Sequence, residues 1–298
     1  MKYYLGIDIG GTNTRIVLLH GLRPQRVRVV TFRTPRNRRA VEAELKKQIS
    51  SICKGVNLSG IGIGVAGVVS QKNNKVVIAG HLPFLDGWNP VKFFRAAFRV
   101  PVITENDVRC FLRAESLWGS ARGKKNVLGI AIGTGIGGAI MIDGKMYRGA
   151  HEVAGEVGDL VLERGRTFET SAAKMAFRRW GDRNEVIGRS IAGLISIVNP
   201  ELIVLGGGAV AKRKVSLPAV KKAVRRFAVT QEAAKTPIVF GKLGDAAQAI
   251  GAALLFADRY GISKSGCVAR WLPCIARFMP SPKLLREPQN LQTSNFTF

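Results

Sequence analysis

The chain has 298 residues, of which 46% are hydrophobic, and a formal net charge of +26. This length and hydrophobic content indicate a soluble globular protein with a large core, most simply arranged in two lobes. No apolar run reaches the roughly 18 residues that a membrane span needs, and the N-terminal MKYYLGIDIGGT lacks the basic and long apolar regions of a signal peptide. We therefore expect a cytoplasmic protein.

The positive charge is concentrated in two segments, residues 23–39 and residues 212–226. Such a field attracts anions, including ATP and nucleic acid. Neither segment is interleaved with aromatic residues, and the sequence has no helix-turn-helix, zinc-finger or RNA-binding signature. We interpret the charge as a solvated basic surface and leave weak nonspecific nucleic-acid binding open.

The cysteines are widely separated in the sequence and form no C-x-x-C pair. This spacing predicts reduced thiols, and it indicates neither a disulfide scaffold nor a zinc site built from cysteines. The four residues are Cys53, Cys110, Cys267 and Cys274.

The first part of the chain predicts a strand, a glycine turn and a second strand, followed by alternating helices and strands. Strands are expected at residues 3–7, 15–19, 26–32, 60–67 and 102–104. The glycine turn occupies residues 8–14, and residues 82–88 form a loop. Helices are expected at residues 38–52 and from residue 107 to about 117.

The second part of the chain repeats this plan. Its elements are a strand at 126–132, a glycine turn at 133–138, strands at 139–142 and 145–147, and buried strands at 202–205 and 237–240. Two glycine hairpins in corresponding places indicate an internal duplication, and hence two α/β lobes that face each other across a cleft. We expect the lobes at residues 1–117 and 118–262, with the last helix able to pack back on the first lobe. Residues 263–298 predict a poorly ordered basic tail with a short amphipathic segment at 269–278.

Gly133, Gly135 and Gly138 match the G-x-G-x-x-G pattern of dinucleotide-binding proteins. That pattern has to follow a strand and open a helix, because the helix N-terminus binds the pyrophosphate. Here the four residues after Gly138 are apolar and partly β-branched, and an Asp-Gly turn then ends the segment. The sequence predicts a strand at this point and therefore argues against a nicotinamide cofactor.

A glycine hairpin can still bind phosphate, because its backbone N–H groups converge and no Cβ atoms obstruct the approach. We expect the two hairpins to bind the phosphates of ATP, and a third glycine cluster to lie against the adenine. The candidate ATP-binding residues are Gly10, Gly11, Thr12 and Asn13, then Gly133, Thr134, Gly135 and Gly137, and finally Gly206, Gly207 and Gly208. Asp8 suits Mg²⁺, directly or through water, since Mg²⁺ prefers one or two carboxylates with phosphate oxygens and water.

Together these motifs resemble the ROK family (repressors, open reading frames, kinases), a branch of the actin and Hsp70-like ATPase superfamily that includes bacterial glucokinases. The matching segments are DIGGTNTR (8–15), ENDVRCFLRAE (105–115), IAIGTGIGGAI (130–140), HEVAGEVGD (151–159) and VLGGGAV (204–210). The resemblance covers residues 1–258. It implies an α/β fold of two ribonuclease H-like lobes with an interlobe cleft, a homodimer, and ATP-dependent phosphorylation of a hexose such as glucose.

The resemblance also implies roles for individual residues. Asp107 becomes the general base that takes the proton of a sugar hydroxyl as it attacks the γ-phosphate, in a reaction that depends mainly on positioning and charge stabilisation. Asn106 and Glu156 would bind sugar hydroxyls, and Gly67 would line the sugar site. A helix cap after a strand is the alternative explanation for the Asn106-Asp107 pair.

The sequence departs from the family at its zinc motif. Members commonly have a histidine, which contacts sugar and binds zinc, where this chain has Asp159, and a C-x-C-G-x-x-G-C-x-E segment follows it. This chain has no cysteine from Leu160 to Ala173, so we expect no zinc site. Asp159 is then a sugar-site candidate, Glu169 corresponds to the final sugar-contacting glutamate of the motif, and His151 is a surface residue.

Three alternatives to a glucokinase-like enzyme remain. The first is a kinase that acts on an N-acetylhexosamine. The second is a sugar-responsive regulator without catalysis, although a phosphate motif that starts at Asp8 leaves no room before it for the helix-turn-helix of family repressors. The third is a nucleic-acid-associated ATPase, which the net charge of +26 suggests.

Overall fold

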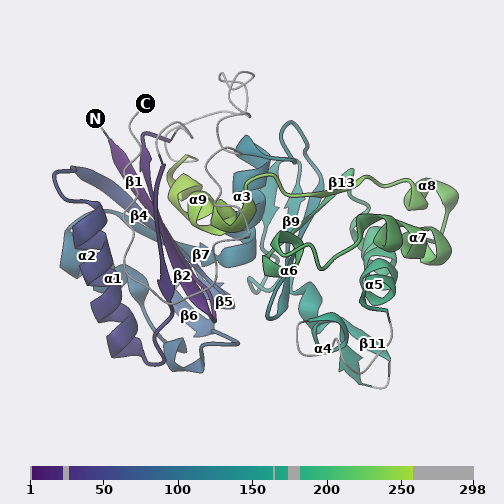
Figure 1. Ribbon diagram of the computed structural model, residues 1–298, viewed down its shortest axis with the longest axis horizontal. Coiled ribbons are helices and arrows are strands. Elements are labelled where there is room, and N and C mark those ends of the chain that lie inside the picture. The colour runs from purple at the N-terminus through teal and green to yellow at the C-terminus, as the bar shows by residue number, and fades with distance from the viewer. Residues whose placement is uncertain (1, 23–26, 164, 174–181, 258–298) are drawn as a thin grey trace. The chain divides into compact units, whose positions relative to one another are not determined.

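The computed structural model of this protein describes residues 2–22, 27–163, 165–173 and 182–257, which form a mixed α/β fold (Figure 1). The chain divides into two compact units. Of the described residues, unit 1 holds those up to 114 and those from 246 to 257, and unit 2 holds those from 115 to 245. The expected tail at 263–298, its segment 269–278, and two of the four cysteines (Cys267 and Cys274) lie outside the described residues. No described helix is long and apolar enough to cross a membrane.

Unit 1 is built on a five-stranded sheet of order β3-β2-β1-β4-β7. Its strands are β1 (Tyr3–Ile9), β2 (Asn13–His20), β3 (Val27–Arg33), β4 (Leu58–Val65) and β7 (Val102–Asn106). Strands β1 and β2 form an antiparallel hairpin, whereas β1, β4 and β7 run parallel. The carboxyl ends of these three parallel strands therefore meet at one edge of the sheet.

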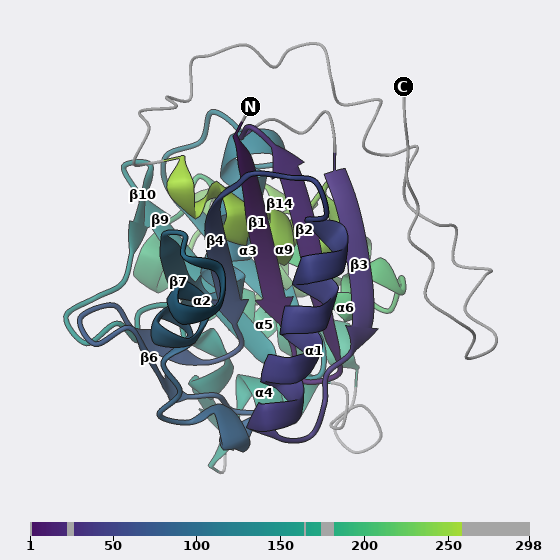
Figure 2. The same cartoon turned by 90° about the vertical axis from the view of Figure 1, so that its left-hand side faces the viewer.

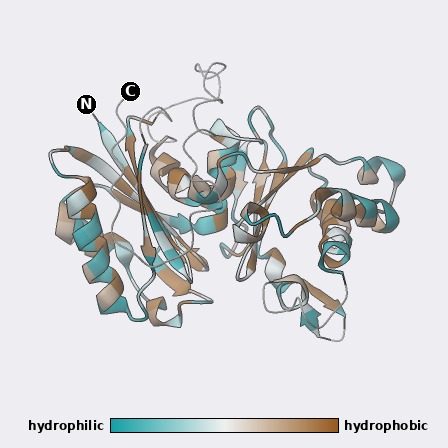
Figure 3. Cartoon of the chain, in the orientation of Figure 1, coloured by the Kyte–Doolittle hydropathy of each residue, from teal (hydrophilic) through white to brown (hydrophobic). Residues whose placement is uncertain are grey.

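One face of this sheet is covered by α1 (Arg38–Ile52) and α2 (Pro90–Phe98), as Figure 2 shows. Helix α1 begins where the Asn37 side chain accepts a hydrogen bond from the backbone N–H of Ala40. Its buried residues Val41, Leu45 and Ile49 recur every four positions, so they form one apolar stripe against the strands. The expected helix at 38–52 is confirmed. Figure 3 shows that the strands of this sheet are largely hydrophobic, whereas α1 carries both hydrophobic and hydrophilic residues.

The other face of the sheet packs directly against α9 (Ala247–Ala253). A Cβ atom on Gly62 would overlap the carbonyl oxygen of Ala252, and one on Gly6 would overlap the carbonyl oxygen of Ala249. A Cβ on Gly60 would lie 2.5 Å from the ring of Phe256. Gly6 and Gly62 therefore leave room for the backbone of α9, and Gly60 leaves room for the ring of Phe256.

Unit 2 repeats this topology in a sheet of order β10-β9-β8-β13-β14. Its strands are β8 (Val127–Ile132), β9 (Ile136–Ile142), β10 (Lys145–Tyr147), β13 (Leu202–Gly206) and β14 (Ile238–Phe240). Strands β8 and β9 are antiparallel, whereas β8, β13 and β14 are parallel. Strand order and direction thus match those of unit 1, as an internal duplication predicts.

Helices α5 (Arg183–Val198) and α7 (Leu217–Phe227) contribute to the core of unit 2 and contact each other closely. A Cβ on Gly188 of α5 would lie 2.6 Å from the carbonyl oxygen of Val220 in α7. The buried side of α7 carries Val220, Ala223 and Val224. Its basic residues Lys222, Arg225 and Arg226 are exposed, which fits a solvated basic surface.

Short elements complete the described chain. They are β5 (Val68–Ser70), β6 (Lys75–Ile78), α3 (Asp107–Trp118), β11 (Val161–Glu163), β12 (Arg166–Thr167), α4 (Phe168–Ala172), α6 (Gly208–Ala211) and α8 (Gln231–Ala234). Single turns of 3₁₀ helix lie at Pro83–Leu85, Val157–Asp159, Gly244–Ala246 and Leu254–Phe256. The first of these lies within the loop expected at 82–88, which otherwise has no helix or strand.

Several expected boundaries differ from those in the structure. Asp8 is the penultimate residue of β1, not part of the turn, and Gly137 lies within β9, where it pairs with Ala131. The glycine turns are shorter than expected because ladder hydrogen bonds continue through glycine as readily as through other residues. The units divide between residues 114 and 115 and between residues 245 and 246, whereas the sequence suggested 117/118 and a second lobe that extends to 262.

The division at residue 115 has a clear cause. The carboxylate of Glu115, in α3, is fully buried and accepts hydrogen bonds from the backbone N–H groups of Ser120 (2.7 Å), Lys242 (3.1 Å) and Leu243 (2.9 Å). These three bonds hold the end of α3 within unit 2. Residues after 245 instead belong to unit 1, because α9 packs on β1 and β4.

The contact between α9 and β4 can be tested with Gly62→Ala. We expect this substitution to lower the free energy of unfolding by about 1–3 kcal/mol or more, because the new methyl group displaces helix backbone. Gly193→Ala in α5 is the matched control, since a Cβ there meets no atom within 4 Å and alanine favours helix over glycine. Denaturant unfolding of both variants measures the difference. Equal stability of the two variants would contradict the packing argument.

Candidate active site

The β1–β2 turn is held in one conformation by Thr34, which follows β3. The Thr34 hydroxyl donates to the carbonyl oxygen of Gly10 (2.6 Å), and its backbone N–H donates to the carbonyl oxygen of Thr12 (3.1 Å). Within the turn, the Gly10 N–H donates to the carbonyl oxygen of Asn13 (3.2 Å). Two of the turn's carbonyl oxygens are thus bonded to one residue that sequence reasoning missed, because nothing local marks Thr34 as its partner.

Asp8 places a carboxylate beside this turn. The residue is 4% exposed, and its Oδ2 lies 3.9 Å from the guanidinium of Arg15 in β2. One carboxylate next to a phosphate turn fits the donor set of Mg²⁺, which takes its remaining ligands from phosphate oxygens and water. Among the described residues, no cluster of three or more His, Cys, Asp and Glu side chains could hold a metal ion.

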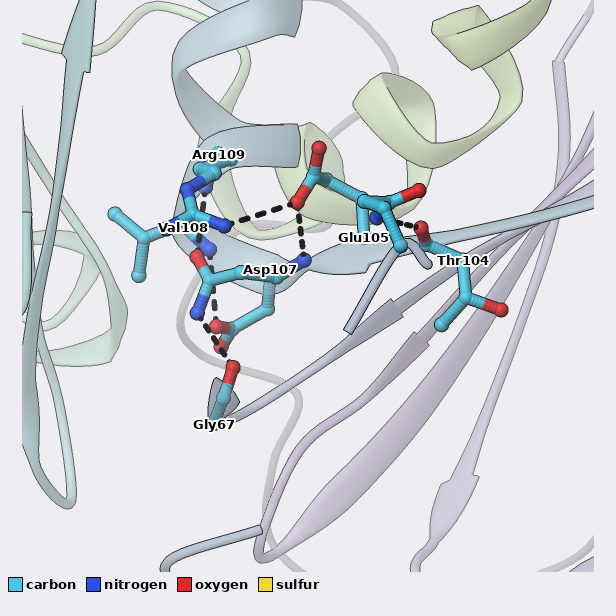
Figure 4. Close-up of polar contacts among 8 residues, drawn as sticks. Gly67, Thr104, Glu105, Asp107, Val108 and Arg109 are labelled. Carbon is cyan, nitrogen blue, oxygen red and sulfur yellow. Dashed lines mark hydrogen bonds and ion pairs between the residues drawn. The ribbon is translucent and has the colours of Figure 1, made fainter. Parts of the chain in front are cut away.

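Asn106 and Asp107 lie at the junction of β7 and α3 (Figure 4). The Asn106 amide donates to the carbonyl oxygen of Gly67 (3.0 Å), and its Oδ1 accepts from the backbone N–H of Arg109 (2.9 Å). The second bond is that of a helix N-cap, so the capping interpretation describes a real contact. The first bond ties the junction to the segment that follows β4.

Asp107 has a strongly perturbed carboxyl group. Burial raises its pKa from 3.8 to about 6, although a hydrogen bond from the backbone N–H of Val108 (2.9 Å) and the nearby charge of His81 both lower it. Burial dominates because it disfavours the ionised form. With a pKa of about 6 the carboxyl group is mostly ionised at neutral pH, and its carboxylate is a stronger base than one with the ordinary pKa of 3.8.

A buried ion pair stabilises the β7–α3 junction. Glu105 and Arg109 are each about 1% exposed, and their side chains lie 3.3 Å apart (Figure 4). Glu105 also accepts a hydrogen bond from the Asn106 backbone N–H (3.0 Å). Breaking such a pair leaves a buried charge uncompensated, so the pair fixes the strand-to-helix turn. This pair was not predicted from the sequence, although the i,i+4 spacing of Glu105 and Arg109 is a local pattern that could have indicated it.

The segment after β6 brings Gly67 and the β1–β2 turn to one place. Gly67 has φ +127°, and a Cβ there would overlap the carbonyl oxygen of Ile78. Three residues further on, the Cβ of His81 would lie 3.0 Å from a Cβ placed on Gly11. His81 is a candidate that sequence reasoning missed, because only the fold places it beside Gly11 and within electrostatic reach of Asp107.

In unit 2 the β8–β9 turn lies beside the third glycine cluster. The Gly133 N–H donates to the carbonyl oxygen of Gly135 (2.8 Å). Gly207 has φ +85°, and a Cβ there would lie 2.7 Å from the backbone N and O of Ile132. Gly208 is the first residue of α6, and its N lies 3.9 Å from a Cβ placed on Gly133. The structure therefore brings together the second predicted phosphate turn and the predicted adenosine motif.

The segment 155–159 packs closely on β9. A Cβ on Gly158 would overlap the carbonyl oxygen of Ile136, and a Cβ on Gly138 would lie 2.5 Å from the carbonyl oxygen of Gly155. This contact explains the last glycine of the G-x-G-x-x-G pattern by packing. Glu156, which is partly buried, precedes the 3₁₀ turn Val157–Asp159, and the side chain of Asp159 is exposed.

Glu169 has a contact that the sequence did not suggest. Its Oε2 accepts a hydrogen bond from the backbone N–H of Ile136 (2.7 Å), the residue that follows the Gly133–Gly135 turn. The buried ring of Phe168 and the Thr167–Thr170 capping box fix α4, and hence Glu169, in this position. Glu169 therefore connects α4 to the start of β9.

The described residues of the segment 160–173, where the sequence predicts no zinc site, are held together by strand pairing and ion pairs. Strands β11 and β12 form a small antiparallel hairpin, in which Arg166 and Glu163 lie 3.3 Å apart. Glu163 also lies 3.9 Å from Arg189 of α5. The thiolate and imidazole ligands that zinc favours are absent from the described part of this segment, so its residues do not fit a zinc ion.

A family model described as ROK family matches residues 4–180 and 164–259 of this chain. The N-acetylgalactosamine kinase AgaK of Shewanella sp. (strain ANA-3) is 27% identical over 301 residues, which cover 85% of this chain and 96% of that protein. A ROK family glucokinase from Streptomyces griseus, solved in complex with glucose and AMPPNP, has a TM-score of 0.76 at 22% identity, covering 85% of this chain and 98% of that one. A ROK family transcriptional regulator, a homologue of the E. coli MLC protein, has a TM-score of 0.73 at 21% identity, covering 87% of this chain and 78% of that one.

Asp107→Asn should stabilise the protein above pH 6. The raised pKa means that the folded state binds a proton more tightly than the unfolded state between about pH 4 and 6, so ionisation of Asp107 costs stability as the pH rises. We expect the variant to melt about 2–6 °C above the wild type at pH 7–8, with a smaller difference toward pH 4. Thermal scans across this range measure it. A difference that does not change with pH would contradict the role of burial.

The Glu169–Ile136 hydrogen bond predicts a local effect of Glu169→Ala. Loss of the acceptor should speed exchange of the Ile136 amide hydrogen and destabilise unit 2 by about 1–3 kcal/mol. Glu169→Gln is the matched control, because its carbonyl oxygen can accept the same bond. Hydrogen exchange read by NMR distinguishes the variants. Unchanged exchange in Glu169→Ala would show that the bond is not formed in solution.

Proposed function

This chain belongs to the ROK family, and on that premise we propose that it is an ATP-dependent hexose kinase with Asp107 as its general base. The observation that carries the proposal is the Asp107 carboxyl group, whose pKa burial raises to about 6. It is positioned at the carboxyl end of β7, two strands from the β1–β2 turn in the same sheet. A base and a phosphate turn at one edge of one sheet are what phosphoryl transfer to a hydroxyl requires.

In the proposed reaction, a sugar hydroxyl oxygen forms a bond to the γ-phosphorus of ATP as the bond from that phosphorus to its bridging oxygen breaks. Asp107 accepts the hydroxyl proton, and ADP leaves with the electron pair of the broken bond. Asn106 and Gly67 orient the sugar, with Glu156 and Asp159 as further sugar-site candidates. When bound at Asp8, Mg²⁺ would neutralise phosphate charge.

Glycines at both turns have a shared task in this proposal. Residues 10–13 and 133–137 would offer backbone N–H groups to phosphate oxygens, and Gly206, Gly207 and Gly208 would face the adenosine. The rigid hold of Thr34 on the first turn supports this role, because a cradle that is already ordered needs no reorganisation during the reaction. Glu169 has two proposed roles. It positions the second turn through its hydrogen bond with the Ile136 N–H, and it is a candidate for contact with the sugar.

Two sugar classes fit the proposal. Glucose and its epimers are one class, and N-acetylhexosamines are the other, since a relative of 27% identity carries the name N-acetylgalactosamine kinase. We further propose a cytoplasmic homodimer. The basic surface is proposed to bind nucleic acid only weakly and without sequence preference, through charge alone.

The proposal is tested by assaying purified protein with ATP, Mg²⁺ and a sugar panel of glucose, mannose, fructose, N-acetylglucosamine, N-acetylmannosamine and N-acetylgalactosamine. We expect turnover with at least one sugar, a loss of about 100- to 10,000-fold in kcat for Asp107→Ala, and an acid limb of kcat near pH 6 because only the ionised carboxylate accepts a proton. Asp143→Ala, at an exposed turn of unit 2, is the control. Saturable sugar binding with no turnover on any sugar would instead favour the regulator.

A further inference from the structure

We propose that His81 is a further catalytic residue, whose imidazole donates a hydrogen bond to the phosphoryl group as it passes to the sugar. The inference rests on the proposed kinase function and adds a residue that the family motifs do not contain. It starts from the position of His81 between two parts of the site, the β1–β2 turn and the β7–α3 junction.

The backbone on either side of His81 is fixed. Ala79 and Leu82 are fully or almost fully buried, and the Ala79 N–H donates to the carboxylate of Asp86 (2.8 Å). The Leu85 N–H donates to the carbonyl oxygen of Leu82 (2.8 Å), which starts the 3₁₀ turn. His81 itself is exposed. An exposed side chain on a pinned segment can meet a ligand without any rearrangement of the backbone.

His81 lies directly against the predicted phosphate turn. A Cβ on Gly11 would be 3.0 Å from the His81 Cβ, 3.7 Å from its Cγ and 3.8 Å from its Cδ2. Gly11 therefore gives the imidazole a close approach to a turn that Thr34 already holds at Gly10 and Thr12. A side chain at position 11 would displace the ring from the place where phosphate oxygens are expected.

The same segment reaches the base. The carbonyl oxygen of Ile78 lies where a Cβ of Gly67 would be, and the carbonyl oxygen of Gly67 accepts a hydrogen bond from Asn106 (3.0 Å). The charge of His81 also lowers the pKa of Asp107, so the two side chains are within electrostatic reach. His81 thus lies against the predicted phosphate turn and within electrostatic reach of the proposed proton acceptor.

An imidazole in this place has a definite chemical use. Neutral or protonated, it offers at least one N–H donor. In phosphoryl transfer, charge develops on the oxygens of the group in flight, and donors that point to these oxygens stabilise the transition state more than the bound substrates. His81 would add such a donor from unit 1, beside the carboxylate that takes the proton.

The test compares His81→Ala with His81→Gln, whose amide keeps an N–H donor, using the full-length protein and the sugar that gives turnover. We expect kcat of His81→Ala to fall about 100- to 1,000-fold, with KM for sugar and the Kd of AMPPNP changed less than about threefold, and partial recovery in His81→Gln. Affinity for ADP with aluminium fluoride and sugar, a mimic of the transition state, should fall by a factor similar to kcat. His151→Ala, at an exposed position of unit 2, should match the wild type.

Each outcome decides the matter. If His81→Ala keeps the wild-type kcat, or if its kcat falls only together with ground-state affinity for AMPPNP and sugar, His81 has no transition-state role and the inference is wrong while the kinase proposal stands. A wild type that turns over no sugar removes both. A selective loss in kcat and in affinity for the aluminium fluoride complex, with partial rescue by glutamine, establishes the role.

Discussion

The architecture of unit 1 depends on the contact between the backbone of α9 and the bare strands β1 and β4. Because Gly6 and Gly62 lack side chains, the helix carbonyl groups of Ala249 and Ala252 lie almost on the sheet. On its other side, Gly251 of α9 meets the backbone of Cys110 in α3, where a Cβ would overlap the Cys110 carbonyl oxygen. One late helix thus positions both the sheet and the helix that begins at Asp107, and the candidate base follows from that packing.

The candidate site combines a buried ion pair, Glu105–Arg109, with a carboxylate, Asp107, whose ionised form burial disfavours. Glu105 and Arg109 neutralise each other in the interior and hold the β7–α3 turn, whereas Asp107, two residues before Arg109, has a carboxyl group whose pKa burial raises. A carboxylate that its surroundings do not fully stabilise is a better proton acceptor at neutral pH than an exposed one. Ionisation of Asp107 lowers the stability of the folded protein, and the same raised pKa makes the carboxylate suited to its proposed function.

Much of the fold follows from local patterns. The expected helix at 38–52 is α1 without a shift, because cap, apolar spacing and helix-forming residues agree there. The strand after Gly138, which argued against a dinucleotide site, is β9. The ends of elements were less predictable: Gly137 lies within β9 and Asp8 within β1, because strand pairing across the sheet, and not the glycine itself, decides where a turn begins.

The sequence by itself determined the duplicated strand–turn–strand plan, the family, and the chemistry available at Asp8, Asn106 and Asp107, since these depend on residue types at short spacing. Only the tertiary structure decided that Glu169 binds the Ile136 amide, that Thr34 holds the first turn and that His81 lies against Gly11. It also decided the pKa of Asp107. These properties arise from contacts between segments tens of residues apart and from exclusion of water, neither of which leaves a local pattern in the chain.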